Sequence, residues 1–199
     1  NLKVSDPQGY SLRVTGNAEG NSFSCDGSCS IDLPSGSGSA NFVVTASKSG
    51  MSVSGSASWD YDPESPNLNL NVNGSTGKNG WYRSSVTVTP TGSDSISGLA
   101  GTFVSVNGGD WQPSATLDDG EHTIDFTAAD YAGNVAYSST NISVDTTTPS
   151  LSVRVKGKTG NGGWYISDTS VSASASDATS GIASLEVSVD GGGYHSYSS

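Results

Sequence analysis

The most constraining feature of this chain is that its sequence repeats. The stretch that begins at Pro66 returns from Pro149 without a gap, so that Gly80-Trp81-Tyr82 is matched by Gly163-Trp164-Tyr165. When the two copies are aligned over 51 positions, 21 are identical. Self-similarity at a fixed period is the signature of an array of small structural units. We therefore expect several small domains, not one large one, and call the offset from Pro66 to Pro149 the repeat length.

Within the repeat, apolar residues alternate with polar ones in short runs, as in Val86 and Val88 or Ile124 and Phe126. This period of two is typical of half-buried strands. The 26 glycines and seven prolines fit many turns, for example Asn79-Gly80. About seven short strands in roughly 80 residues is typical of an immunoglobulin-like sandwich. Strands are predicted near 67–72, 82–90, 102–107, 111–112, 115–117, 122–129 and 135–144, with another at 51–61.

Two proline-containing junctions divide the chain, at Asp62–Pro66 and Asp145–Pro149. Proline and β-branched residues keep such linkers extended, which limits tumbling of neighbouring domains. Residues 1–61 are predicted to form a shortened domain with a cysteine hairpin, and residues 62–145 a complete domain. Residues 146–199 are predicted to form a truncated copy of the second domain.

Several motifs recur in order. They include Gly-Trp-Tyr at 80–82, Asp-x-x-Ser-Gly at 94–98, and Asp-x-Ala-Gly-Asn at 130–134. In these motifs the chain resembles the tandem bacterial Ig-like domains of secreted and cell-surface proteins, closely over 62–199 and loosely over 1–61. The resemblance implies an all-β fold of tandem Ig-like sandwiches in an elongated array, at an extracellular or cell-surface location. It also implies a spacer or stalk role, because most members of the family are spacers.

The second copy of the repeat is expected to be incomplete. Ser199 corresponds to Thr116, so the equivalent of 117–145, which would form the last two strands, is not in the sequence. A half-sandwich would leave unpaired backbone groups and an open apolar face. Either the chain is part of a longer array, or another chain supplies the missing strands.

The formal net charge is −11, and the eight basic residues form no patch in the sequence. Nucleic acids and anionic membrane surfaces both require clustered lysine and arginine, so neither is an expected partner. The sequence shows no membrane-spanning segment and no signal peptide. Acidity is expected to give solubility.

The two cysteines, Cys25 and Cys29, are predicted to form a disulfide that staples a hairpin turn. Two thiols without a nearby histidine supply only half of a zinc shell, and the spacing differs from a redox Cys-x-x-Cys. Closing a loop of about five residues would contribute on the order of 2 kcal/mol. A structural disulfide implies an oxidising, extracellular setting.

Aromatic residues offer two interpretations. Trp81, Tyr82, Trp164 and Tyr165 could stack on sugar rings, or could pack at a domain junction, since each pair follows a glycine turn. The packing role is favoured. Trp111 follows a Gly-Gly turn and is expected at a sheet edge.

Acidic residues gather at the junctions, with Asp60, Asp62 and Glu64 at the first and Asp145 at the second. Calcium prefers oxygen ligands, so these residues are candidate calcium ligands, with solvated carboxylates as the favoured alternative. Other acids, at Asp94, Asp130 and Asp177, lie in turns and are expected to cap backbone N–H groups.

No nucleophile elbow of the Gly-x-Ser-x-Gly type occurs, and the histidines are isolated, so we expect no enzyme activity and no required cofactor. The leading hypothesis is a non-catalytic spacer of an extracellular protein, with neighbouring domains as its partners. The first alternative is an adhesin module that binds a glycan or a surface protein. The second alternative is a fibre subunit in which copies of the chain exchange strands.

Overall fold

The computed structural model describes residues 2–4, 11–18, 21–26, 29–31, 38–48 and 50–198. Every described element is a β-strand, apart from a single-turn 3-10 helix at Asn161–Gly163. The predicted all-β class is therefore confirmed. Each sheet uses strands from only one of the three predicted domains, while the boundaries themselves stay predictions.

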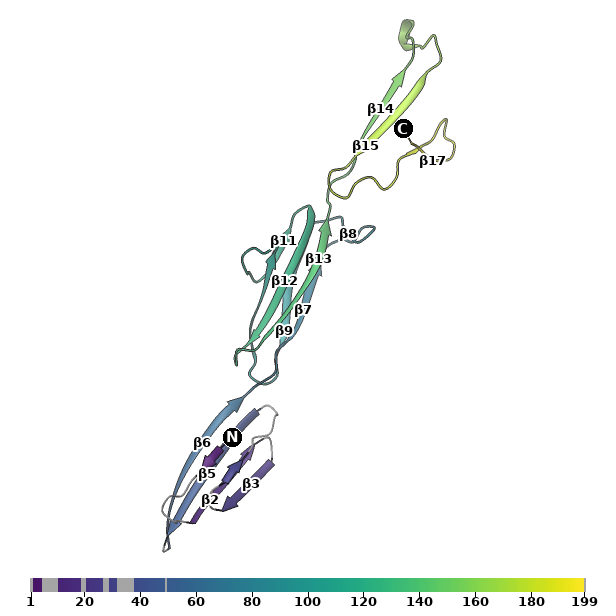
Figure 1. Cartoon of the computed structure of the whole chain (residues 1–199). Helices are drawn as coiled ribbons and strands as arrows, with labels where there is room; N and C mark the ends of the chain where they lie inside the picture. Colours follow the sequence, from purple (N-terminus) through teal and green to yellow (C-terminus); the bar gives the residue numbers. More distant parts are fainter. Residues whose placement is uncertain are drawn as a thin grey trace. The chain divides into compact units, whose positions relative to one another are not determined.

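The first sheets are built from strands that precede the first junction. A four-stranded antiparallel sheet has the order β3-β2-β5-β6, and β1 pairs with β4 (Figure 1). The β5–β6 hairpin runs from Lys48 paired with Met51 to Gly38 paired with Tyr61, as the strand predicted at 51–61 requires. The bounds are β1 Leu2–Val4, β2 Ser11–Ala18, β3 Asn21–Asp26, β4 Cys29–Ile31, β5 Gly38–Lys48 and β6 Met51–Tyr61.

The cysteines lie at two strand ends of these first sheets. Cys25 is on β3, opposite Val14, and Cys29 is on β4, opposite Val4. Their side chains lie outside the described part of the chain. The disulfide between them stays a prediction.

Between the two junctions the strands form the two sheets of an immunoglobulin-like sandwich (Figure 1). One sheet has the order β11-β9-β7, and the other has the order β10-β12-β13-β8. The predicted Ig-like fold is confirmed here. The bounds are β7 Asn67–Asn73, β8 Trp81–Tyr82, β9 Val86–Ser93, β10 Leu99–Val106, β11 Ala115–Leu117, β12 Gly120–Asp130 and β13 Val135–Val144.

The single strand predicted over 82–90 is wrong, because the chain changes sheets inside it. Trp81 and Tyr82 of β8 pair in parallel with the end of β13. From Val86 onward, β9 pairs with β11 in the other sheet. The change of sheet places the residues between Tyr82 and Val86 at the end of the sandwich, beside the second junction.

The chain divides into two compact units, and the middle sandwich contributes to both. In the second unit the buried apolar side chains come from both sheets, and Ile124 and Val86 are fully buried. In the first unit, Phe126 and Ala128 of β12 are buried. The first unit is Asn1–Leu70, Pro90–Phe103 and Phe126–Ser138, and the second is Asn71–Thr89, Val104–Asp125 and Ser139–Ser199.

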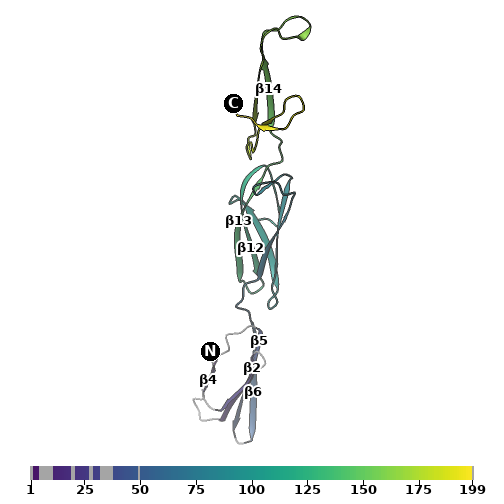
Figure 2. The ribbon, with the colours of Figure 1, turned by 90° about the vertical axis from the view of Figure 1, so that its right-hand side faces the viewer.

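After the second junction, β14 (Ser150–Lys156) and β15 (Ser170–Ser176) form an antiparallel hairpin, and β16 (Glu186–Val187) pairs with β17 (His195–Ser196) (Figures 1 and 2). Leu151 of β14 is 63% exposed, and Val171 of β15 is 56% exposed. Their counterparts in the middle sandwich are less exposed. Leu68, which corresponds to Leu151, is half-buried, and Val88, which corresponds to Val171, is fully buried. These repeated apolar residues are therefore less exposed in the middle sandwich than after the second junction.

Candidate functional site at the domain junctions

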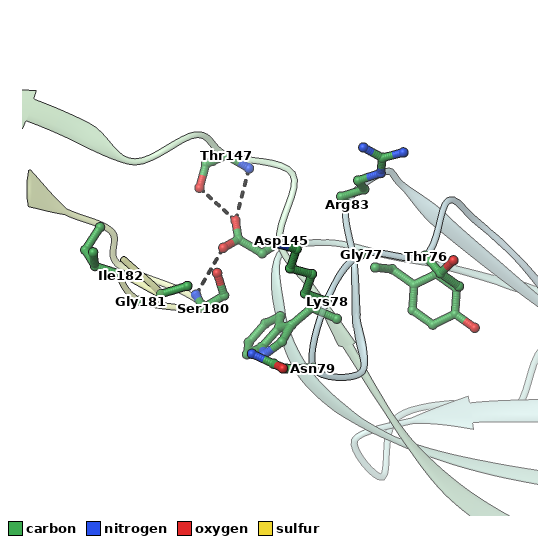
Figure 3. Close-up of a pocket in the computed structure, with 13 residues that line it drawn as sticks. Thr76, Gly77, Lys78, Asn79, Arg83, Asp145, Thr147, Ser180, Gly181 and Ile182 are labelled. Atoms are coloured by element: carbon green, nitrogen blue, oxygen red, sulfur yellow. Dashed lines mark hydrogen bonds between the residues drawn. The ribbon is translucent and has the colours of Figure 1, made fainter. Parts of the chain in front are cut away.

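Asp145 connects the end of the middle sandwich to the loop of the next repeat. Its backbone N–H donates to the Tyr82 carbonyl at 2.8 Å, which fixes it to β8. Its carboxylate accepts the N–H of Thr147 at 3.0 Å and that of Ser180 at 3.0 Å (Figure 3). Asp145 is only 8% exposed. One side chain therefore hydrogen-bonds its own linker and the next repeat, while its backbone bonds the preceding strand.

The first junction has the same arrangement, one repeat length earlier in the sequence. Asp62 accepts the N–H of Glu64 at 3.0 Å on one carboxylate oxygen and that of Ser97 at 3.0 Å on the other. Asn134 adds a bond in the opposite direction, because its side-chain amide donates to the Asp62 carbonyl at 3.0 Å. The same hydrogen-bond pattern from linker to loop therefore occurs at both junctions.

The loops that receive the linker aspartates are themselves shaped by an aspartate. The carboxylate of Asp94 accepts the N–H groups of Ile96 at 3.0 Å and Gly98 at 2.9 Å. Asp177 makes the same two bonds in the next repeat, at 3.1 and 2.9 Å. Gly98 has a φ of 85°, which favours glycine there. The predicted capping role of these aspartates is confirmed.

The electrostatics of the linker aspartates follow from these bonds. Hydrogen bonds from Ser180, and then from Thr147, lower the pKa of Asp145 from 3.8 to about 2. Hydrogen bonds, chiefly from Ser97, lower the pKa of Asp62 as well. Hydrogen bonds to a carboxylate favour its charged form, so both side chains stay ionised at neutral pH.

A pH prediction follows for Asp145. Its pKa in the folded state is below the unfolded value, so its contribution to stability is complete above about pH 4 and is lost as the pH falls toward about 2. We expect Asp145→Asn to be less stable than the wild type at pH 6, and the difference to shrink steeply as the pH falls through about 2. Urea unfolding at successive pH values measures this. A difference that is unchanged at pH 2 would contradict it.

Three carboxylates meet at the first junction. Oxygens of Asp62, Asp94 and Asp130 lie within 4.8 Å of one another. Asp130 is only 3% exposed, and it accepts the N–H of Gly133 at 2.7 Å and both the backbone and side-chain N–H of Asn134 at 2.8 Å. Hard oxygen donors of this kind suit calcium, which takes six to eight oxygen ligands.

The structure groups the predicted calcium ligands differently from the sequence. Only Asp62 belongs to the three-carboxylate group, together with two residues that the sequence predicts as caps. Asp60 accepts a hydrogen bond from the Ser39 hydroxyl, and Asp145 accepts one from the Ser180 N–H at the second junction. Calcium binding stays a prediction.

The aromatic residues differ between the two copies. Trp81 and Tyr82 are half-buried on β8. Trp164 is 77% exposed and Tyr165 is 41% exposed. Trp111 is 49% exposed, and its neighbour at position 112 makes only an isolated bridge to β10. The aromatic pair is therefore more covered in the first copy, where β8 pairs with β13, and its packing role stays a prediction.

A cavity of about 630 Å³ opens beside the second junction. Its walls come from the hairpin that precedes β8 and from the Ser180 loop, with Asp145 between them (Figure 3). Sequence reasoning missed this site, although one signal was present. Between positions 62 and 145 the only lysine and arginine are Lys78 and Arg83, and both line the cavity.

One stretch in the middle of the chain matches a known protein family. Residues 82–146 match the family model described as a bacterial Ig-like domain. No curated protein matches the chain. Within the described residues, no helix has the length and apolar character needed to span a membrane.

Proposed function

We propose, from the premise that residues 82–146 form a bacterial Ig-like domain, that this chain is a non-catalytic spacer segment of an extracellular or cell-surface protein. The observation that carries the proposal is the hydrogen bonding of Asp62 and Asp145. Both aspartates bond the loop of the following repeat, at the same distance and one repeat length apart. A spacer needs junctions of this kind, because a freely tumbling junction does not hold its domains apart.

The linker composition supports the same role. Pro63 and Pro66 flank the first linker, and Pro149 ends the second, so the backbone between domains has few accessible conformations. Strands of ten residues span about 33 Å, so each sandwich would extend an array by roughly 35–40 Å. Neighbouring domains of the same array are the proposed partners.

Scattering and relaxation measurements test the spacer role. A compact protein of this length has a radius of gyration of about 16 Å. We expect small-angle X-ray scattering of the chain to give a clearly larger value. For Asp145→Ala we expect NMR relaxation to show faster, less correlated tumbling of the two domains, because the bond to Ser180 is lost.

The matched control is Asp110→Ala, which removes an exposed carboxylate from the middle sandwich. It is expected to leave both measurements unchanged. A radius of gyration near the compact value would overturn the spacer role. Equal tumbling of wild type and Asp145→Ala would show that Asp145 does not restrain the junction.

A further inference from the structure

We propose that the cavity beside the second junction binds an acidic sugar, with Lys78 and Arg83 holding the carboxylate and Trp81 lying against the ring. The proposal is independent of the spacer role, since a spacer needs no ligand. It assigns this cavity a ligand of defined chemistry, a saccharide that carries uronic acid groups.

The charge distribution is the first observation behind the proposal. From position 62 to position 145 the chain has ten aspartates and glutamates, and Lys78 and Arg83 are its only lysine and arginine. Both line the same cavity. Among the described residues, neither side chain makes an ion pair or a hydrogen bond. The ionised Asp145 also lines the cavity, and its carboxylate accepts hydrogen bonds from Thr147 and Ser180. Two cations without partners therefore outnumber the single carboxylate on the wall and form a local site for an anion.

Comparison of the two repeats shows that the fold does not need these cations. The second copy keeps the hairpin, because Gly160 N–H bonds the Trp164 carbonyl at 2.7 Å, as Gly77 N–H bonds that of Trp81. At the positions of Lys78 and Arg83, however, it has Asn161 and Ile166. The cations are therefore a property of this cavity and not of the scaffold.

The hairpin holds the binding groups in place before a ligand arrives. Asn79 and Gly80 have φ values of 54° and 83°, and the Trp81 N–H donates to the Lys78 carbonyl at 3.1 Å. These features define a tight turn with positive φ at both central residues, as in type I′. Lys78 and Trp81 flank the turn, so their backbones are fixed relative to each other. Preorganisation of this kind lowers the entropic cost of binding.

The shape and lining of the cavity favour a sugar over a peptide. Its volume lies within the range of about 300–1,000 Å³ for small-molecule sites. Trp81 lines the cavity, and the negative charge density on the face of an indole ring attracts the polarised C–H groups of a sugar ring. Thr76, Asn79 and Thr147 add hydrogen-bonding groups suited to hydroxyls. A carboxylate on the sugar would pair with the guanidinium and the ammonium.

Calorimetric titration at low salt tests the proposal on the whole chain. The probes are a tetrasaccharide of galacturonic acid, its methyl ester and a hexa-aspartate peptide. We expect the acidic tetrasaccharide to bind at least about tenfold more tightly than its neutral ester, because esterification removes the charge-assisted bonds. The double variant Lys78→Gln/Arg83→Gln is expected to lose at least about tenfold in affinity.

The matched control is Arg154→Gln/Lys156→Gln, which removes the same charge from exposed positions of β14. It is expected to keep the affinity within about twofold, apart from the effect of net charge. Equal loss in both double variants, equal binding of acid and ester, or no binding would overturn the proposal. Tighter binding of hexa-aspartate would assign the cavity to an acidic peptide instead. Thermal unfolding of each variant confirms that it is folded.

Discussion

Replacement of Ile124 by alanine is expected to lower the free energy of unfolding of the middle sandwich by about 3 kcal/mol. Ile124 has no exposed surface and is among the largest fully buried side chains of the described residues. The substitution removes buried methylene and methyl groups and leaves a cavity that the two sheets cannot fill without moving. Urea unfolding followed by circular dichroism measures the loss.

Val135→Ala is the matched control, because it shortens an apolar side chain of the same sandwich that is 57% exposed. It is expected to cost less than about 1 kcal/mol. A comparable loss in the two variants would contradict the position of Ile124 at the centre of the core. An unfolded Ile124→Ala variant agrees with the prediction only if Ile124→Val remains folded with a smaller loss.

The sandwich could be predicted from the sequence because period-two alternation reports directly on which side chains face a core. Val86 and Val88 are recognisable in this way, and both are fully buried. The turn at Asn79-Gly80 is also recognisable, because asparagine and glycine are the residue types that tolerate positive φ. Both residues adopt positive φ in the structure. The alternation of apolar residues and the backbone preference of a turn both depend on residues that are close together in the sequence, so the sequence alone shows them.

The junction sites could not be predicted because they depend on contacts between distant residues. Asp62, Asp94 and Asp130 meet only after the sandwich has formed. In the sequence Asp62 is one of several junction acids, and Asp94 and Asp130 look like ordinary turn residues. The division of 82–90 into β8 and β9 was missed for a related reason. Tyr82 pairs with Val144, far along the chain, and no local pattern shows which sheet a strand joins.

Replacement of Asp130 by alanine is expected to destabilise the middle sandwich by about 3 kcal/mol, because three hydrogen bonds to a charged carboxylate are lost. Asp130 is 3% exposed, and its carboxylate accepts three N–H groups, one from Gly133 and two from Asn134. A single hydrogen bond to a charged group contributes about 1.5–3 kcal/mol. Asp130→Asn keeps an acceptor oxygen and nearly the same shape, so it is expected to lose less stability than Asp130→Ala. Urea unfolding of the two variants measures this difference in the free energy of unfolding.

The Asp130 variants also decide the calcium prediction. Unfolding in EDTA, without bound calcium, measures the contribution of the hydrogen bonds alone. The control Asp110→Ala, at an exposed site, is expected to lower the free energy of unfolding by less than about 0.5 kcal/mol. If calcium binds Asp62, Asp94 and Asp130, millimolar calcium raises the Tm of the wild type and not that of Asp130→Ala. Equal Tm values with calcium and with EDTA would contradict calcium binding and leave capping as the role of all three carboxylates. Stability of Asp130→Ala close to that of the wild type in EDTA would contradict the capping role itself.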